Sequence, residues 1–342
     1  VIGTVGEADK RFTEDALRML RAVRFACELR FMCNKEVLDN ITRNNGLIKE
    51  ISAERIRDEF VKIIDSPEPM NGLILAHQTG LLHHILPELE KSIGMEQKGE
   101  HVYDIWEHTV RSLQHAADKN YPLHVKLAAM LHDLGKVKTR RPGLKGKEFT
   151  FYGHEVVGER IAVDFMARLK FPNKLADLVV KMVRNHMFFA DPDKITLSAV
   201  RRVIANVGPE NIWDLMNLRI CDRIGMGRPK EEPYRLRKYE SMIEEALRAP
   251  TSVGMLKIDG KQIMTVTRET PGPKVGHILN ALLEEALDNP DINTPEYLEK
   301  RAIELAKLDE KALKELADKG KSKKEEVEEG EIKKIRTKYR VK

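Results

Sequence analysis

Three short segments of the sequence carry side chains suited to holding a metal ion. His108 lies in DIWEHTVRSL, the adjacent pair His132 and Asp133 ends the apolar run LAAMLHDLGK, and Asp222 lies in RICDRIG. A carboxylate among apolar neighbours is costly to bury unless a cation lies beside it. We therefore predict that these four side chains hold one divalent metal ion.

The predicted donor set combines two imidazoles with two carboxylates. Such a set suits Mn, Fe, Ni, Co or Mg better than a structural zinc ion, which prefers thiolates in a closed tetrahedron. Four protein ligands on an octahedral ion leave room for water, which hydrolysis requires. The pattern therefore indicates a hydrolytic metal centre, with Asp133 counted among its catalytic residues as well as its ligands.

A basic stretch follows the His–Asp pair. Beside a metal ion its side chains would hold an anionic substrate; otherwise they form a solvated loop in which Lys136 lies favourably against a helix C-terminal dipole. The neighbouring metal site favours the first interpretation for Lys136 and Arg140, which we predict to be catalytic. The stretch comprises Lys136, Lys138, Arg140, Arg141, Lys145 and Lys147.

The composition favours helices over strands. The chain of 342 residues is long enough for two or three compact units, and only 6% of its residues are aromatic, while good helix formers dominate. We expect an all-α fold with at most a short hairpin, for which residues 149–152 supply the extended stretch. The expected helices cover residues 13–29, 35–44, 53–65, 72–80, 104–118, 125–134, 154–169, 173–186, 197–206, 210–224 and 234–248, a helix from near Lys274, and 296–319.

The net charge and the cysteine content limit which binding partners and which cellular compartment we expect. A net charge of +5 permits a nucleic-acid partner without requiring one, because positive charge must cluster to matter. Three cysteines without a CxxC pair indicate reduced core residues rather than a disulfide framework or a thiolate zinc site. No run approaches the roughly 18 apolar residues of a membrane span, and the first residues lack the layout of a signal peptide. We expect a cytoplasmic protein without a membrane partner.

The order of the metal-site motifs resembles a known superfamily. The histidine, the His–Asp pair with its Gly-Lys stop and the later aspartate fall on successive predicted helices, as in the HD superfamily of metal-dependent phosphohydrolases, which residues 101–225 resemble. In members with two metals, histidines at the relative places of His154 and His186 bind the second ion, so the resemblance implies a binuclear option here. From the residues alone, a helix-end histidine that contacts phosphate or caps a carbonyl remains an alternative.

The first predicted helix carries a row of charges. Its spacings place five charged residues along one side of that helix, which Thr13 is expected to cap: Glu14, Asp15, Arg18, Arg21 and Arg24. Such a row is commonly a solvated face with ion pairs. The same side chains also suit the reading of bases, because carboxylates accept from the exocyclic amines of cytosine and adenine and arginine donates to their ring acceptors. Both interpretations remain open at this point.

The segment RFTEDALRMLRAVRF resembles the neck-helix motif of the bacterial, class II CCA-adding tRNA nucleotidyltransferases and their poly(A) polymerase relatives. The resemblance continues through ISAERIRDEFVKII, GLLHHILPEL, HDLGK, FYGHEVVGERIA, RNHM and MLKIDGKQIM to PGPKVGHILNALLEEAL. In that family the motif's Glu, Asp and first Arg template the incoming CTP or ATP. This implies that Glu14, Asp15 and Arg18 bind nucleotide, with Arg21 beside them.

Members of this family begin with a nucleotidyltransferase head, whose Gly-Ser motif and paired aspartates bind two Mg ions. Nothing of that kind precedes Val1, and VIGTVGEADKRF resembles the last residues of a head. We therefore expect no nucleotidyl transfer from this chain alone, and one complete active site, the HD one. The resemblance implies tRNA or other RNA and nucleotides as partners, tRNA 3′-end processing as the context, and a phosphohydrolase or phosphodiesterase activity.

We expect four regions along the chain. They are a neck and RNA- or nucleotide-binding region at residues 1–95, an HD domain at 96–228, a C-terminal helical body at 229–295 and a charged, partly disordered tail at 296–342. The tail is expected to be solvated, or to use its basic end, residues 333–342, as an arm that touches nucleic-acid phosphates.

Two other interpretations stay open. The chain can be a non-catalytic RNA-binding module whose HD site holds a structural metal or none. It can also be one subunit of a split nucleotidyltransferase, in which a separate head protein docks onto the first helix, or a homodimer.

Overall fold

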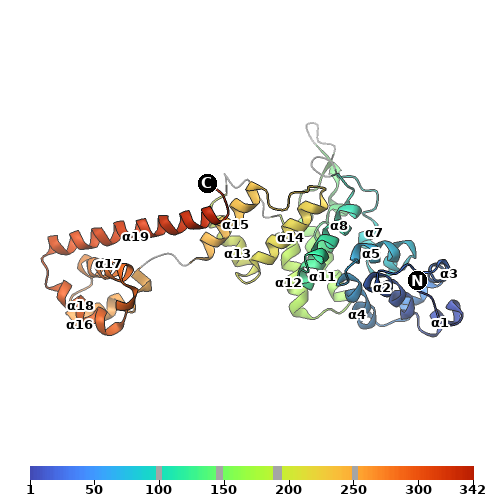
Figure 1. Cartoon of the computed structure of the whole chain (residues 1–342), viewed down its shortest axis with the longest axis horizontal. Helices are drawn as coiled ribbons and strands as arrows, with labels where there is room; N and C mark the ends of the chain where they lie inside the picture. The colour runs from blue at the N-terminus through green and yellow to red at the C-terminus, as the bar shows by residue number, and fades with distance from the viewer. Residues whose placement is uncertain (98–101, 144–148, 188–194, 249–252) are drawn as a thin grey trace. The chain divides into compact units, whose positions relative to one another are not determined.

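The computed structural model separates the chain into two compact units (Figure 1). Unit 1 is Val1–Arg235 and unit 2 is Leu236–Lys342. The described residues of the whole chain are mostly helical, with one two-stranded hairpin among them, which confirms the expected all-α fold. The finer division into four regions stays a prediction. The structure describes every residue except 98–101, 144–148, 188–194 and 249–252.

Local signals in the sequence account for most helix ends in unit 1. The side chains of Asn34, Ser52 and Asp104 cap the helices that follow them, each by accepting a hydrogen bond from a backbone N–H. The helices are α1 (Ala8–Glu14), α2 (Leu17–Leu29), α3 (Lys35–Asn44), α4 (Ala53–Ile64), α5 (Pro69–Gln78), α6 (Leu81–Ile85), α7 (Pro87–Glu90), α8 (Ile105–Asp118), α9 (Leu123–Leu131), α10 (Lys136–Thr139), α11 (His154–Arg168), α12 (Asn173–Asn185), α13 (Leu197–Val207) and α14 (Ile212–Gly225), with a 3-10 helix at Asn45–Glu50.

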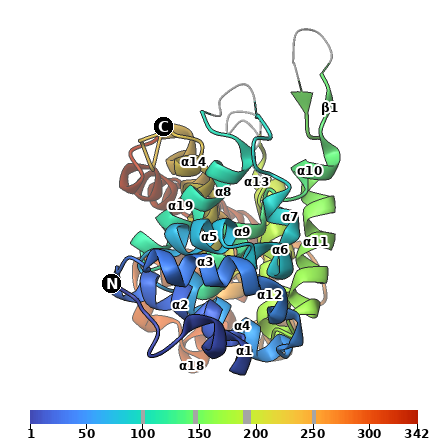
Figure 2. The ribbon, with the colours of Figure 1, turned by 90° about the vertical axis from the view of Figure 1, so that its right-hand side faces the viewer.

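Two groups of helices pack together within unit 1 (Figure 2). In the neck, α2 packs against α4 and α5, and Leu20, Val23 and Phe60 are wholly buried there. In the second group, α8, α12 and α14 surround α9, and residues 125–136, in α9 and the turn after it, are all buried. Because α5 also packs against α8, the two groups share one compact unit.

The hairpin follows α10 directly. β1 (Arg141–Pro142) pairs antiparallel with β2 (Phe149–Thr150), with Arg141 opposite Thr150. The extended stretch expected at residues 149–152 therefore exists, although only its first two residues belong to the strand.

The first expected helix is broken in the structure. α1 ends at Glu14, Asp15 has an extended backbone (φ −152°, ψ 100°), and α2 begins at Leu17. The Asp15 carboxylate accepts a hydrogen bond from Leu17 N at 3.2 Å, so this side chain starts a new helix instead of lying within one. The Thr13 hydroxyl donates to Asp9 O inside α1 and caps nothing, so the expected cap was wrong.

Unit 2 is a smaller helical assembly with its own core. Its helices and turns are α15 (Tyr234–Leu247, which begins at the boundary), α16 (Gly260–Thr267), α17 (Pro273–Asp288), α18 (Pro295–Ala306) and α19 (Glu310–Lys338), with 3-10 turns at Val253–Met255 and Pro290–Ile292. Ile263, Ile278 and Leu298 are fully buried members of this core. α17 and α19 approach closely at Gly320, where an added Cβ would lie 2.2 Å from Asn280 O.

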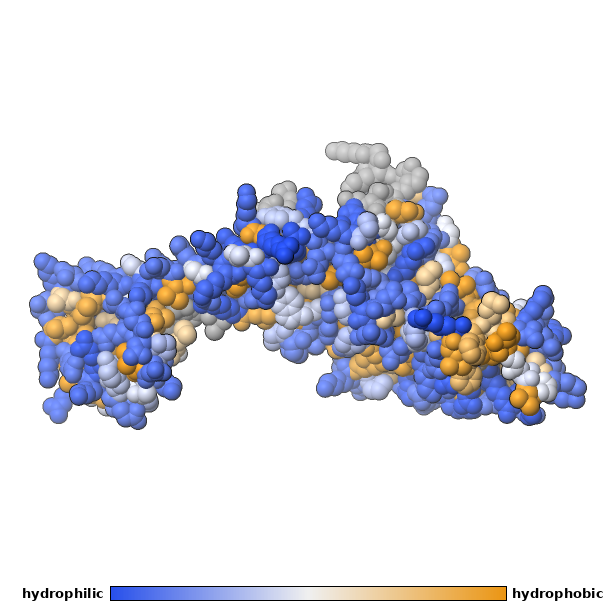
Figure 3. All heavy atoms as spheres, viewed as in Figure 1, coloured by the Kyte–Doolittle hydropathy of each residue, from blue (hydrophilic) through white to orange (hydrophobic). Residues whose placement is uncertain are grey.

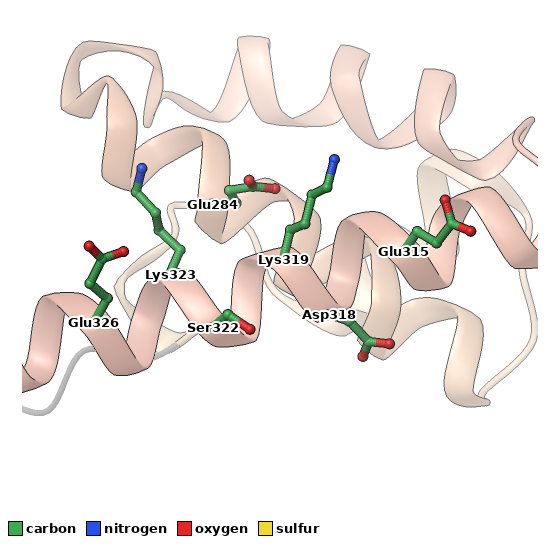
Figure 4. A pocket seen from close by; sticks show the side chains of 7 residues that line it. All are labelled: Glu284, Glu315, Asp318, Lys319, Ser322, Lys323 and Glu326. Carbon is green, nitrogen blue, oxygen red and sulfur yellow. The ribbon is translucent and has the colours of Figure 1, made fainter.

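The highly charged C-terminal segment is helical well past the expected end at residue 319. α19 continues to Lys338 because its side chains find partners on other helices: Lys323 pairs with Asp288 at 2.5 Å, and Lys338 and Tyr339 both bond Glu244 at 2.7 Å. A surface pocket of about 610 Å³ lies between α17 and α19 and is lined by charges of both signs (Figure 4). The basic end of the chain is therefore held against α15 in this structure.

Most of the face shown in Figure 3 is polar, and apolar residues gather at several places on it, among them the end that holds the N-terminal helices. Phe25, Leu29, Phe31 and Met32 are among the exposed large apolar residues of unit 1. Across the residues that the structure describes, no helix combines the length and apolar character needed to cross a bilayer.

Candidate metal centre

The four predicted ligands come from three helices of unit 1 and meet in its interior. His108 lies one turn into α8, which Asp104 caps by accepting from Glu107 N at 2.7 Å. His132 ends the apolar helix α9 with Asp133 directly after it, and Asp222 lies in the last turn of α14. The four side chains are at most about 5% exposed, so each donor atom is shielded from bulk water.

The donor atoms converge closely enough for one ion to contact all of them. The Nε2 atoms of His108 and His132 are 3.1 Å apart. His108 Nε2 is also 3.0 Å from Asp133 Oδ2 and 3.4 Å from Asp222 Oδ1. Two imidazole nitrogens and two carboxylate oxygens at such separations need a proton or a cation among them, which is the chemistry of a metal site.

Backbone hydrogen bonds orient three of the imidazoles in this region. The Nδ1 atoms of His132, His154 and His186 contact backbone carbonyls: Ala129 O at 2.9 Å, Phe151 O at 2.9 Å and Val183 O at 2.6 Å. When Nδ1–H donates to a carbonyl, the Nε2 lone pair is left for a metal. This arrangement of second partners is typical of histidines that bind metals.

His154 and His186 form a second donor group on the other side of Asp133. Their Nε2 atoms are 3.2 Å apart, and they lie 3.4 Å and 3.8 Å from Asp133 Oδ1. Asp133 thus offers Oδ2 to one histidine pair and Oδ1 to the other. The sequence left a second-metal role and a carbonyl contact as alternatives, and the structure contains the carbonyl contact together with a geometry suited to a second ion.

Two glycines allow the helices to approach closely enough for this convergence. A Cβ at Gly225 of α14 would lie 2.0 Å from Ser112 Oγ and 2.6 Å from His108 O. A Cβ at Gly135, in the turn after α9, would lie 1.9 Å from His154 O on α11. Larger residues at either place would push the donor-bearing helices apart.

Two cations contact the carboxylates from outside the donor group. Lys136 Nζ lies 2.6 Å from Asp133 Oδ2 and also 2.6 Å from Gln97 Oε1, and the Lys136 side chain is only about 8% exposed. Arg219, one turn before Asp222 on α14, donates to Asp222 Oδ2. Neither Gln97 nor Arg219 was predicted from the sequence to lie at the centre. The i, i+3 spacing of Arg219 and Asp222 was a signal for the second, whereas Gln97 approaches only through the fold.

The charges of the centre shift the pKa values of its groups. Burial alone would raise the pKa of both carboxyl groups. Lys136 and His132 outweigh this effect at Asp133 and hold its pKa well below the ordinary range. Arg219 does the same for the pKa of Asp222. Burial also lowers the pKa of His132, yet the two carboxylates raise it to about 10. A proton on His132 and a metal ion would therefore balance the same negative charge.

The predicted phosphate-holding residues lie near the centre but differ in their contacts. Lys136 is buried against Asp133, as described above. The Arg140 guanidinium stacks on the Phe149 ring of β2 at 3.7 Å, and Lys138 is exposed. Arg141 belongs to β1. Lys145 and Lys147, also part of the predicted basic stretch, lie outside the described residues.

The predicted nucleotide-binding residues form ion pairs on the surface of the neck. The Glu14 carboxylate is 2.6 Å from Arg18 Nη1, and hydrogen bonds from Arg18 and Arg11 lower the pKa of Glu14. Asp15 pairs with Arg55 at 3.0 Å. This pattern matches the solvated face with ion pairs that the sequence left open, and the nucleotide role stays a prediction.

The last two arginines of that row lie beside a buried carboxylate that was not predicted from the sequence. Arg21 Nε lies 3.5 Å and Arg24 Nε 3.2 Å from Glu59, whose side chain is 5% exposed. Glu59 lies on α4, within the quoted ISAERIRDEFVKII segment, where only its contact with α2 distinguishes it from the neighbouring charges.

Two family models match the chain. Residues 30–93 match the family described as the probable RNA and SrmB-binding site of polymerase A, and residues 105–224 match the HD domain. The second match covers His108, His132, Asp133 and Asp222. Residues 30–93 are therefore similar to a region described as the probable RNA and SrmB-binding site of polymerase A, and residues 105–224 are similar to HD domains.

Two tRNA nucleotidyltransferases resemble most of this chain in sequence. The CC-adding tRNA nucleotidyltransferase of Thermus thermophilus is 31% identical over 285 residues, which cover 81% of this chain and 63% of the relative. The A-adding tRNA nucleotidyltransferase of Deinococcus radiodurans is 29% identical over 293 residues, which cover 82% and 66%. Over its neck and HD regions the chain is therefore a relative of the CCA-adding tRNA nucleotidyltransferases, as the sequence motifs indicated.

A solved structure shares the fold. The Bacillus stearothermophilus CCA-adding enzyme, crystallised in complex with CTP, matches with a TM-score of 0.50 at 24% identity, over 89% of this chain and 65% of that chain. The chain thus spans slightly less than two thirds of the length of each of these three relatives.

Proposed function

We propose that this chain is a tRNA-handling relative of the CCA-adding enzymes whose HD centre binds a divalent metal and hydrolyses phosphoesters at RNA ends. One observation carries the proposal: the side chains of His108, His132, Asp133 and Asp222 bring two imidazole nitrogens and two carboxylate oxygens to one buried point. The match to the HD family over residues 105–224 supports it.

The donor set supports Mn, Ni, Mg, Fe or Co as the ion, for the reasons of ligand type given above. Such an ion would supply positive charge that polarises a phosphoester and makes water a better nucleophile. His154 and His186, with Asp133 Oδ1, are proposed ligands of a second ion.

The chain's own residues would bind and orient the substrate. Asp133 lies between the two histidine pairs and so fixes their separation through both of its oxygens. Arg140 lies next in the chain after α10, and its stacking on Phe149 leaves the edge of the guanidinium plane for a phosphate oxygen. Lys136 adds positive charge beside Asp133, where phosphate charge would gather.

The test is metal analysis of the purified protein followed by hydrolysis assays. Activity on p-nitrophenyl phosphate and on RNA with a 2′,3′-cyclic phosphate end should appear with Mn, Ni or Mg and vanish with EDTA. Asp133→Ala should abolish it, whereas Asp118→Ala, an exposed aspartate at the end of α8, should not. Unchanged hydrolysis by the Asp133→Ala protein would refute the proposed centre.

For the neck we propose binding of tRNA and of CTP or ATP, with Glu14, Asp15 and Arg18 contacting the base. Glu14 and Arg18 place an acceptor and a donor 2.6 Å apart on the surface, a combination that matches the edges of cytosine and adenine. Nucleotidyl transfer itself would need the head that the family resemblance implies, fused or separate. Fluorescent CTP should bind more weakly to Glu14→Gln than to Glu50→Gln, an exposed glutamate elsewhere in the neck.

A non-catalytic role is the second candidate, and one observation favours it. Lys136 and Arg219 already neutralise part of the carboxylate charge, so the site can fold without an ion. Protein that shifts tRNA in a gel, contains no metal after purification and takes up none would support this alternative.

A further inference from the structure

The proposed metal centre has an unusual charge arrangement for a cation site. Both of its carboxylates share their charge with a neighbouring protein cation. Asp133 Oδ2 lies 2.6 Å from Lys136 Nζ, and Asp222 Oδ2 accepts from Arg219. Each of these oxygens belongs to a carboxylate that is at most about 5% exposed, so water does little to screen the contacts.

Lys136 is held in this position by a second, neutral partner. Gln97 is buried, accepts from Lys136 Nζ at 2.6 Å and donates to Asp104 O at 3.3 Å, which ties it to the start of α8. The ammonium is thus fixed on Oδ2, the same oxygen that faces His108 and His132. A metal at that place has to share this oxygen with Lys136.

A divalent ion therefore adds two positive charges to a buried place where two protein cations already contact the carboxylates. Uncompensated charge in a water-poor interior is costly. An anion beside the ion removes the excess, and a phosphate group carries the required charge and the oxygens to accept from Lys136.

We propose that a divalent metal ion and a phosphate group bind this centre cooperatively, with Lys136 and Arg219 as the residues that keep metal affinity low until the anion arrives. The inference rests on the proposed metal centre and deepens it, because it ties the centre to anionic substrates. Arg219 acts here through Asp222 and is a positioning residue, whereas Lys136 contacts Asp133 and would also donate to the phosphate.

The first test measures binding in the wild-type protein. Free Mn²⁺ is followed by its electron paramagnetic resonance signal at fixed pH and ionic strength, with inorganic phosphate or with chloride, and with correction for manganese phosphate in solution. Phosphate should tighten Mn²⁺ binding about fivefold or more, and Mn²⁺ should tighten phosphate binding by the same factor. Equal Mn²⁺ affinity in phosphate and in chloride would overturn the inference.

The second test removes the competing cations. Lys136→Met should bind Mn²⁺ about tenfold or more tightly in chloride and should lose most of the phosphate effect. Lys138→Met is the matched control, because Lys138 carries the same charge two residues away and is exposed. Arg219→Met, at a site about 21% exposed, should act in the same direction through Asp222 and serves if the Lys136 variant does not fold. Wild-type Mn²⁺ affinity in both folded variants would contradict the proposal.

The outcomes separate this inference from the proposed function. Absence of Mn²⁺ binding with and without phosphate overturns the inference, and absence of Mn, Ni and Mg binding together overturns the proposed function as well. Hydrolysis with uncoupled binding overturns only the inference. Coupled binding without hydrolysis of any tested phosphoester supports the inference and removes the catalytic proposal.

Discussion

The metal centre and the neck surface contain the same kind of ion pair in different surroundings. Lys136 Nζ and Asp133 Oδ2 are 2.6 Å apart, and so are Arg18 Nη1 and Glu14 Oε2. The first pair is 8% and 2% exposed, whereas the second is 38% and 50% exposed. Water screens the neck pair and competes for its hydrogen bonds, so equal distances do not mean equal energies. Burial therefore decides how much the free energy of unfolding changes when each ion pair is broken.

Breaking the buried pair should produce the largest effect. Asp133→Ala leaves the Lys136 ammonium buried without its carboxylate, which typically costs about 3–5 kcal/mol. Urea unfolding in EDTA should show this loss. The double variant Asp133→Leu, Lys136→Met should recover much of it, because apolar residues of similar volume replace both charges. Comparable stability of the single and double variants would show that the pair is weaker than its burial implies.

Close helix packing at the centre supplies the next largest effect. Gly225→Ala places a methyl 2.0 Å from Ser112 Oγ and 2.6 Å from His108 O, and overpacking of this kind typically costs about 1–3 kcal/mol. Gly330→Ala in α19 is the matched control, since nothing lies within 4 Å of its added Cβ. That control should gain about 0.5–1 kcal/mol because alanine favours helix. Thermal unfolding measured by circular dichroism distinguishes the two.

The pH dependence of stability should also distinguish the centre from the neck. The folded-state pKa of His132, raised by Asp133 and Asp222 to about 10, lies above the ordinary value near 6.5 of an unfolded chain. Its contribution to stability is therefore fully present below about pH 6.5 and is lost as the pH rises through about 10. Ion-free protein should become easier to unfold in urea over that range. His132→Gln should flatten this trend, and an identical trend in that variant would assign it to other groups.

The neck pair should give the smallest effect. Glu14→Gln should leave the urea midpoint unchanged, because the carboxylate it removes is exposed and screened. The difference in the free energy of unfolding between the Asp133→Ala variant and the wild-type protein should stay nearly constant as the salt concentration rises. The reason is that salt screens a buried ion pair little. A shift of the midpoint in Glu14→Gln as large as that in Asp133→Ala would remove the distinction between the two regions.

Local sequence signals were enough to predict much of the helical fold. α3 has the expected bounds, and α8 begins directly after the Asp104 cap, because caps and apolar periodicity act within a few residues. The ordered motifs also singled out four side chains, His108, His132, Asp133 and Asp222, which the fold brings together. Their role as metal ligands stays a prediction. Their residue types limited the possible chemistry before any geometry was known.

Only the tertiary structure decided which long-range partners each charge meets. The break at Asp15 depends on its carboxylate bonding Leu17 N instead of continuing the helix, and α19 extends to Lys338 because α15 and α17 supply partners. Gln97 reaches Lys136 across 39 positions of sequence, and Glu59 meets Arg21 across 38. Sequence by itself determined which groups could bind a metal or a phosphate. The fold determined their burial, and burial sets the strength of every charge they carry.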